Sequence, residues 1–323
     1  MTGVVLVRAI AWAIGLILLM SFNALFLIYY ERKVLGHIHL RPGPLHTGWH
    51  GILQTAADGL KMMIKEDVIP GRANRLFFWI APAIVVVPAY LSYVTLPFQP
   101  GFAMAELGLG VFFIFAVVAV MPIGFTLAGW ASHNKYSLLG ALRSAAQQIS
   151  YEVPMLLSVL GVVVMAGSLK FTEIVEQQKY VWYVFKQPLG FAILFITLLA
   201  EMNRTPFDMP EAESELVAGY HTEYSGMKFG LFMVAEYSAL FVAGMITSLL
   251  FLGGWNMPFL PASFVWVLLK TYLIAAVVIW VRGTLPRIRV DMMMELGWKY
   301  LIPLSLANLL LAGVLSAIWP KYF

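Results

Sequence analysis

The amino-acid sequence predicts an all-α polytopic membrane protein, and its composition is the first reason. Hydrophobic residues make up 61% of the 323 residues, only 12% are charged, and the mean hydropathy is +0.82. Soluble globular domains carry about 25% charged residues, so this composition excludes that class. The second reason is a set of eight apolar stretches, each close to the roughly 20 residues that a helix needs to cross a bilayer.

The eight expected membrane helices define a single membrane domain over residues 1–323. We expect them near residues 9–30, 76–97, 107–131, 149–168, 183–201, 228–252, 263–282 and 301–319. The fifth is the weakest, because Lys186 and Pro188 interrupt it and leave only a short apolar run from Leu189 to Ala200. The first lacks a small-residue cleavage site, which predicts a permanent helix rather than a signal peptide.

The distribution of positive charge predicts the orientation of the bundle. Loops two and six hold no Lys or Arg, whereas the cations of loops one, three, five and seven are Arg32, Lys33, Arg41, Lys61, Lys65, Arg72, Arg75, Lys135, Arg143, Arg204, Lys228, Arg282, Arg287, Arg289 and Lys299. Loops that are rich in Lys and Arg face the cytoplasm. The odd-numbered loops are therefore expected there, with both chain termini on the opposite side.

The first cytoplasmic loop, residues 31–75, is expected to contain an amphipathic helix that lies in the membrane interface. Its apolar face would carry Ile52, Ala56, Leu60, Met63 and Ile64, and its polar face Gln54, Asp58, Lys61 and Lys65. The preceding strip, ERKVLGHIHLRPGP, carries a carboxylate, cations and imidazoles directly after the first span, and could frame an opening. The alternative is a girdle of cations whose apolar stems lie along the lipid.

Acidic residues concentrate between Glu201 and Tyr237. This stretch holds seven of the 17 acidic residues, Glu201, Asp208, Glu211, Glu213, Glu215, Glu223 and Glu236. It lies at the edge of the membrane, where an uncompensated charge is costly, so a functional role is the first hypothesis. The alternative for Asp208 and Glu211 is structural, because Asp208 has the position of a helix N-cap and Gly219 would end that short helix. Glu211 and Glu215, one helical turn apart, are expected to repel each other.

Few charged residues are expected within the membrane spans, and among them are Glu152, Glu201, Glu236 and Lys270. Such residues usually face the interior of a bundle, pair with one another and mark ion or proton paths. Glu152 and Glu201 have no cation within their own spans comparable to Lys270, which makes them candidates for proton exchange. For Glu236 and Lys270 the alternative is a neutralising pair that only aligns two helices.

The sequence predicts that this chain holds no metal ion and no cofactor. The absence of cysteine excludes disulfides and any iron–sulfur cluster that depends on thiolate ligands from this chain. The histidines lie in loops or at the ends of spans, which argues against a membrane haem. His46 and His50 have the spacing of a helical metal clasp, but no third ligand is near, so a role as polar loop residues is favoured.

Five long motifs carry a family resemblance. They are ERKVLGHIHLRPGP, GILQTAADGLKMMIKED, GWASHNKYSLLGALRSAAQQISYEV, AEMNRTPFDMPEAESELVAGYHTEYSGMKFGLFMVAEY and RGTLPRIRVDMMMELGWKYLIPLSL. With them the chain resembles the family formed by the H subunit of bacterial NADH:quinone oxidoreductase (complex I), equivalent to mitochondrial NADH dehydrogenase subunit 1. The resemblance extends over nearly the whole chain. One departure is His39, where the family more often has Gln.

The resemblance implies a bacterial inner-membrane subunit that lies between a hydrophilic redox arm and antiporter-like membrane subunits, beside small membrane subunits. Quinone would be the substrate, and partner subunits would bind NADH, FMN and the iron–sulfur clusters. Loops 31–75 and 202–227 would form the quinone chamber, with Glu31, Arg32, Arg41, Asp58, Lys61, Arg204 and Asp208 as quinone-binding residues. Proton coupling would use Glu152, Glu201, Glu211, Glu213, Glu215, Glu223 and Glu236.

Two other functions compete with this interpretation. The equivalent membrane subunit of a membrane-bound hydrogenase or formate hydrogenlyase resembles the same family but uses no quinone, and the close fit of the ERK to RPGP strip favours the quinone enzyme. A stand-alone ion transporter would use Glu236 and Lys270 as its ion site. Against the transporter, no internal repeat relates the two halves of the chain, although transporters often show one.

Overall fold

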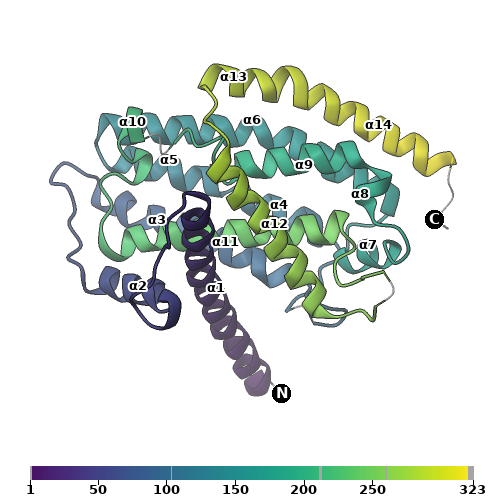
Figure 1. The fold of residues 1–323 in the computed structure, drawn as a ribbon, viewed down its shortest axis with the longest axis horizontal. Helices are drawn as coiled ribbons and strands as arrows, with labels where there is room; N and C mark the ends of the chain where they lie inside the picture. The colour runs from purple at the N-terminus through teal and green to yellow at the C-terminus, as the bar shows by residue number, and fades with distance from the viewer. Residues whose placement is uncertain (1, 103, 211–212, 259, 319–323) are drawn as a thin grey trace.

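A computed structural model describes residues 2–102, 104–210, 213–258 and 260–318, and every regular element within these ranges is a helix (Figure 1). In this part of the chain, seven helical segments are long and apolar enough to cross a membrane. They are α1 (Thr2–Ile38), α3 (Arg75–Thr95), α4 with α5 (Gly110–Val118 and Met121–Ala131), α6 (Lys135–Ala166), α11 (Gly226–Phe251), α12 (Phe264–Thr284), and α13 (Val290–Glu295) continued by a π-helix (Leu296–Leu301) and α14 (Ile302–Ile318). The expected all-α membrane class is confirmed.

The fifth expected span is shorter than the others, so the predicted count of eight is not confirmed. Residues 183–201 form α8 (Tyr183–Lys186) and α9 (Pro188–Glu201), with a break at Gln187. α9 has 14 residues and at 1.5 Å per residue is about 21 Å long, less than the ~30 Å of a bilayer core. Pro188 explains the break, because proline has no N–H to donate to a preceding turn and is favoured at the start of a helix.

α6 begins well before the span expected near residues 149–168. The helix starts at Lys135, where the side chain of Asn134 accepts a hydrogen bond from the Tyr136 N–H and caps it. α6 packs against α5, α9 and α14, which lie alongside it in Figure 1. The contact with α5 is close, since a Cβ on Gly129 would overlap the Ser137 carbonyl oxygen. Only glycine fits at that position.

α11 is the second central helix, and it packs against α1, α3 and α12. Every residue of α11 from Leu240 to Phe251 is buried. Large apolar side chains are instead exposed on the peripheral helices, for example Phe22 on α1 (69% exposed) and Leu310 on α14 (72% exposed). This arrangement suits a membrane, where lipid covers the outer apolar faces of the bundle.

The amphipathic helix expected in the first loop forms as α2 (Gln54–Ile64), and it packs against α1 and α11. Its apolar residues Leu60 and Ile64 are exposed (61% and 87%), as an interfacial helix requires. α1 itself continues to Ile38. Glu31 and Arg32, which we assigned to the loop, are therefore held on a rigid helix.

The short helix expected to begin after Asp208 is smaller than predicted. Met209 and Pro210 are not helical, so Asp208 does not cap a helix, and the described helix is α10 (Glu213–Leu216). Glu211 lies outside the described residues. α10 ends before Gly219, because the next residue, Val217, takes a left-handed conformation with φ of 65°. Gly219 instead starts a 3₁₀ turn, η2 (Gly219–His221).

Candidate functional site

Arg204 lies at the centre of a buried network of charges. It follows α9 in the loop 202–210 and is 2% exposed. One guanidinium nitrogen lies 2.5 Å from Glu31 Oε2 on α1, and the other lies 2.9 Å from Glu236 Oε1 on α11. The guanidinium also stacks over the Tyr237 ring, 4.7 Å from its centroid.

Arg282 on α12 completes this network by pairing with the second oxygen of Glu31. Two carboxylates and two guanidiniums therefore meet where α1, α11, α12 and the loop after α9 converge. Burial of a charge costs several kcal/mol unless the charge is paired. Burial lowers the pKa of Arg204, but the carboxylates of Glu236 and Glu31 outweigh it and hold that pKa well above its usual value. Arg204 is therefore a permanent cation.

A polar side chain of α6 and a backbone N–H of the loop after α12 position the loop that carries Arg204. The Gln147 amide donates to the carbonyl oxygens of Ala200 and Phe207, both at 2.7 Å. The Ile288 N–H donates to the Pro206 carbonyl at 3.1 Å. These hydrogen bonds fix an irregular loop inside the bundle, where unpaired backbone groups would be costly.

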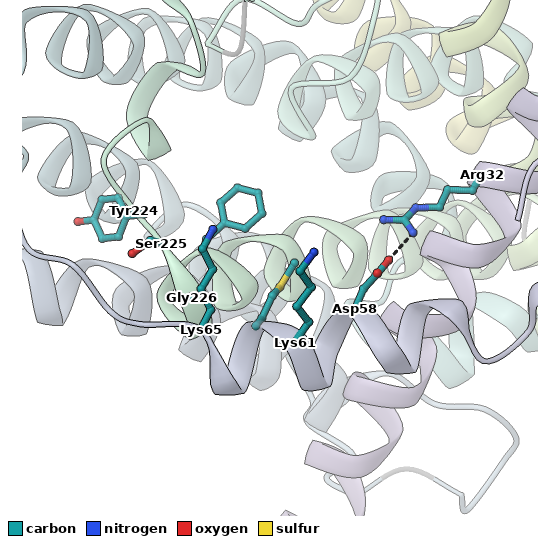
Figure 2. A pocket seen from close by; sticks show the side chains of 9 residues that line it. Arg32, Asp58, Lys61, Lys65, Tyr224, Ser225 and Gly226 are labelled. Atoms are coloured by element: carbon teal, nitrogen blue, oxygen red, sulfur yellow. Dashed lines mark hydrogen bonds and ion pairs between the residues drawn. The ribbon is translucent and has the colours of Figure 1, made fainter. Parts of the chain in front are cut away.

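A pocket of about 420 Å³ lies beside the network, between α2, the end of α1 and the start of α11 (Figure 2). Arg32 pairs with Asp58 at 2.5 Å, and Lys61 and Lys65 project from α2 toward the same opening (Figure 2). The remaining lining residues are Met62, Tyr224, Ser225, Gly226 and Phe229. The pocket thus combines cations with aromatic and apolar surface, at a size typical of small-molecule sites.

Glu201 borders a second, smaller cavity of about 40 Å³ inside the bundle. Its other lining groups are mostly apolar, among them Phe115, Met121 and Met155. The Oε2 atom of Glu201 is buried and has no hydrogen-bond partner in the described part of the chain. A space of this volume can hold water, which would hydrate that oxygen. Glu152 on α6 is close enough for its charge to repel that of Glu201.

The other acidic residues predicted for proton coupling lie nearer the surface. Glu215 pairs with Arg143 at 2.6 Å and its side chain is 53% exposed, and the hydrogen bond from Arg143 lowers its pKa. Glu223 accepts a hydrogen bond from the Asn134 amide at 2.6 Å. The expected repulsion between Glu211 and Glu215 and the role of Glu213 fall on side chains outside the described part of the structure.

The predicted quinone-binding residues divide into two groups. Arg32, Asp58 and Lys61 line the pocket, whereas Glu31 and Arg204 belong to the buried network. Asp208 is half-buried in the loop after α9, and its charge acts on Glu236. Arg41 is exposed beyond the end of α1 and is not brought to either group.

The suggested pair of Glu236 and Lys270 is wrong. Glu236 pairs with Arg204, and the Lys270 ammonium is bound by backbone carbonyl oxygens at the far end of α11. The two residues are at opposite ends of the membrane helices, because Glu236 lies near the start of α11 while Lys270 lies next to its end. The ion site of the transporter interpretation is therefore not formed.

Sequence reasoning missed several residues of the site. Arg282 and Tyr237 complete the charge network, and Lys65, Tyr224 and Phe229 line the pocket. Lys65 could have been found from the sequence, because it lies four positions after Lys61 and so on the same helical face. Nothing in the local sequence indicates that Arg282 meets Glu31, because 251 positions separate them.

Comparison with known proteins connects this geometry to one family. The family model described as NADH dehydrogenase matches residues 11–313, a range that contains the whole network and the whole pocket. The chain belongs to the NADH dehydrogenase family. The NADH-quinone oxidoreductase H subunit of Dehalococcoides mccartyi (strain CBDB1) is 48% identical over 308 residues, which are 94% of this chain and 87% of that protein.

Two further relatives match at nearly full length. The NADH-quinone oxidoreductase H subunit of Geobacillus sp. (strain WCH70) is 48% identical over 315 residues, and that of Bacillus mycoides (strain KBAB4) is 48% identical over 314 residues. Each alignment covers 94% of this chain and 94% of the relative. The resemblance of the five sequence motifs to this family is thereby confirmed.

Proposed function

We propose that this chain is a membrane subunit of complex I that helps to form the quinone-binding chamber and couples quinone reduction to proton translocation. One observation carries the proposal: the consecutive residues Glu31 and Arg32 lie in two different sites. Arg32 lines the pocket, and Glu31 belongs to the buried network around Arg204. A change of charge in the pocket therefore reaches the network through a single turn of α1.

The pocket provides groups that suit a quinone head. Its cations Arg32, Lys61 and Lys65 can donate to quinone carbonyl oxygens, and Tyr224 and Phe229 offer apolar surface to the ring. In the assembled enzyme we place this surface, formed by loops 31–75 and 202–227, against the hydrophilic arm. Partner subunits there would supply the electrons through NADH, FMN and iron–sulfur clusters.

Reduction of quinone to quinol takes up two electrons and two protons and leaves the bound molecule neutral. We infer that side chains at the pocket supply these protons and become more negative, which changes the charge of the pocket. We infer that the ion pair between Arg32 and Asp58 changes first. The ion pairs of Arg204 with Glu31 and with Glu236 would then change in relative strength. Loop 202–227 would repack, and Glu201, which borders the smaller cavity, would exchange protons with Glu152. The connection to the surface would be made by Glu211, Glu213, Glu215 and Glu223. We call these four residues, together with Glu152, Glu201 and Glu236, the acidic row.

The proposed function also predicts which partners contact each part of the chain. Cytoplasmic loops would contact the redox arm, and the outer faces of the helices would contact lipid, small membrane subunits and antiporter-like subunits. The membrane is the bacterial inner membrane, with both termini on the periplasmic side. The names of the relatives support the quinone enzyme over the hydrogenase alternative, and the separation of Glu236 from Lys270 removes the support for a stand-alone transporter.

The test is to replace Glu152 or Glu215 by Gln in the intact complex. Inverted membrane vesicles then give two readouts, quinone-linked proton pumping and NADH oxidation by an artificial acceptor that bypasses quinone. We expect proton pumping to fall severalfold while NADH oxidation by the artificial acceptor stays unchanged, because each variant alters only one carboxylate of the acidic row. Glu173→Gln is the matched control, since Glu173 is an exposed carboxylate on α7 (Phe171–Gln177) that interacts with Lys170 and Ser168, both of which lie just before α7. Unchanged pumping in both test variants would remove the relay.

A further inference from the structure

Another buried cation, Lys270, lies outside the proposed relay. It belongs to α12 and is 6% exposed. About 18 Å of helix separates it from Arg282, the cation of α12 that reaches Glu31. Lys270 is therefore near the end of the bundle opposite the charge network, where α11 ends.

Three backbone carbonyl oxygens enclose the Lys270 ammonium. Nζ lies 2.6 Å from the oxygen of Leu252, 2.8 Å from that of Gly254 and 2.7 Å from that of Asn256. These contacts use all three N–H groups of the ammonium. The Trp182 ring covers the cation with its centroid 4.5 Å from Nζ, and the carbonyl end of α11 adds a favourable dipole. We call this arrangement the carbonyl cage.

The backbone around the cage is held in its shape by neighbouring elements. Gly253 and Gly254 have φ values of 72° and 49°, and a Cβ on Gly253 would lie 2.6 Å from the Trp182 ring. The side chain of Gln178 accepts a hydrogen bond from the Gly253 N–H at 3.0 Å and donates one to the Leu249 carbonyl at 2.8 Å. The cage is thus a rigid site built for one positive charge.

An apolar layer separates the cage from the carboxylates. α11 is buried on all sides from Leu240 to Phe251, and the facing residues Ile274, Ala275 and Val278 of α12 are also buried. Two cavities lie at the same level of α11, one of about 40 Å³ beside Glu201 and one of about 10 Å³ beside Thr247. A cavity needs roughly 10–15 Å³ to hold one water molecule. The residues of α11 from Ser248 to Phe251 are buried and line neither cavity, so they lie between both cavities and the cage.

We propose that Lys270 is an electrostatic seal that stops protons of the acidic row from leaking through this chain to the opposite side of the membrane. A fixed positive charge beyond an apolar layer repels an approaching proton, as fixed charges and helix dipoles do in selective pores. The inference depends on the proposed function only in assuming that protons reach the acidic row. The seal itself acts without quinone turnover.

Passive proton leak through the purified complex in liposomes tests the seal, in the absence of NADH and quinone. An imposed pH gradient is followed with an enclosed pH-sensitive dye, for the wild type, Lys270→Met and Lys270→Arg. We expect the gradient to decay severalfold faster with Lys270→Met, which removes the charge at similar length, and at nearly the wild-type rate with Lys270→Arg, which keeps it.

Two results would overturn the seal. One is a Lys270→Met complex that oxidises NADH normally with an artificial acceptor and yet holds the gradient as well as the wild type. The other is an equal leak in the Met and Arg variants, which would assign the effect to packing.

Gly253→Ala is the control for packing, because it strains the cage but leaves the charge in place. Should Lys270→Met prevent assembly, Lys270→Gln supplies a second neutral variant. Because the leak needs no turnover, its outcome is independent of the relay test with Glu152 and Glu215.

Discussion

At the scale of single residues, Arg204 shows why the network needs arginine. Its guanidinium presents separate nitrogens to Glu31 and Glu236 while its face stacks on Tyr237. A lysine ammonium is a compact point charge and cannot hold two carboxylates from different helices in this fork geometry. Buried ion pairs contribute little net stability compared with apolar packing, but the loss of one partner leaves an unpaired buried charge. The main contribution of Arg204 is therefore that it holds Glu31 and Glu236 in place.

Arg204→Lys should reduce quinone-linked NADH oxidation about tenfold, because it loses at least one charge-assisted hydrogen bond worth about 1.5–3 kcal/mol. Arg204→Met should also destabilise the chain by about 3–5 kcal/mol, since Glu236 would lose its nearest cation. Turnover assays and thermal unfolding of the purified complex measure the two effects. Arg72→Lys, at an exposed position of the first loop, is the control and should change neither. Wild-type turnover in Arg204→Lys would show that the bridge is dispensable.

At the scale of elements, the pocket depends on how α2 is fastened to the start of α11. Lys228 on α11 pairs with Asp67 at 2.8 Å and lies 3.7 Å from the centroid of the Trp79 ring. Ser225 accepts a hydrogen bond from the Val68 N–H at 3.2 Å. These contacts join the segment after α2 to α11 and so fix the distance between two walls of the pocket.

Asp67→Asn should loosen this fastening and raise the apparent KM for quinone severalfold, with a smaller change in kcat. The reason is that a lost ion pair widens the pocket without removing any group that lines it. Steady-state kinetics with a short-chain quinone measure both constants. The neighbouring Glu66→Gln changes the same charge at an exposed position and should behave as the wild type. A change in kcat alone would contradict the positional role of the pair.

At the scale of the whole molecule, the bundle is electrically asymmetric. The carboxylates and their cations gather around the ends of α1, α9 and α12 and the start of α11, and the opposite end holds Lys270 in its carbonyl cage. The region between them is buried and mostly apolar. Under the proposed function, such a distribution would let protons accumulate at one end of the bundle and would oppose their passage at the other.

The predicted orientation can be tested by cysteine labelling, because the chain has no cysteine of its own. Glu106→Cys, in the exposed loop between α3 and α4, should react with a membrane-impermeant maleimide in spheroplasts. Gly71→Cys, in the exposed segment after α2, should react only in inverted vesicles, since the positive loops are expected in the cytoplasm. The reverse pattern would invert the assigned topology.

The sequence by itself determined the class of the protein, most of its spans, the amphipathic helix α2 and the family. These features depend on hydropathy, on helical periodicity and on contiguous motifs, all of which are local properties of the chain. The same local rules found Glu236 as a charge inside a span, whereas Glu31 and Arg204 were named only through the family resemblance, as quinone-binding residues. The local rules also identified the fifth apolar stretch as the weakest, and Pro188 indeed leaves only 14 residues of it in α9.

Only the tertiary structure decided which charges meet. Glu31 and Arg204 are 173 positions apart, and Glu31 and Arg282 are 251 apart, so their pairing follows from how α1, α11 and α12 pack. Lys270 illustrates the same point, because a search among acidic residues could not find a partner made of backbone carbonyl groups. A buried charge requires compensation, and the folded arrangement of the helices selects the group that provides it.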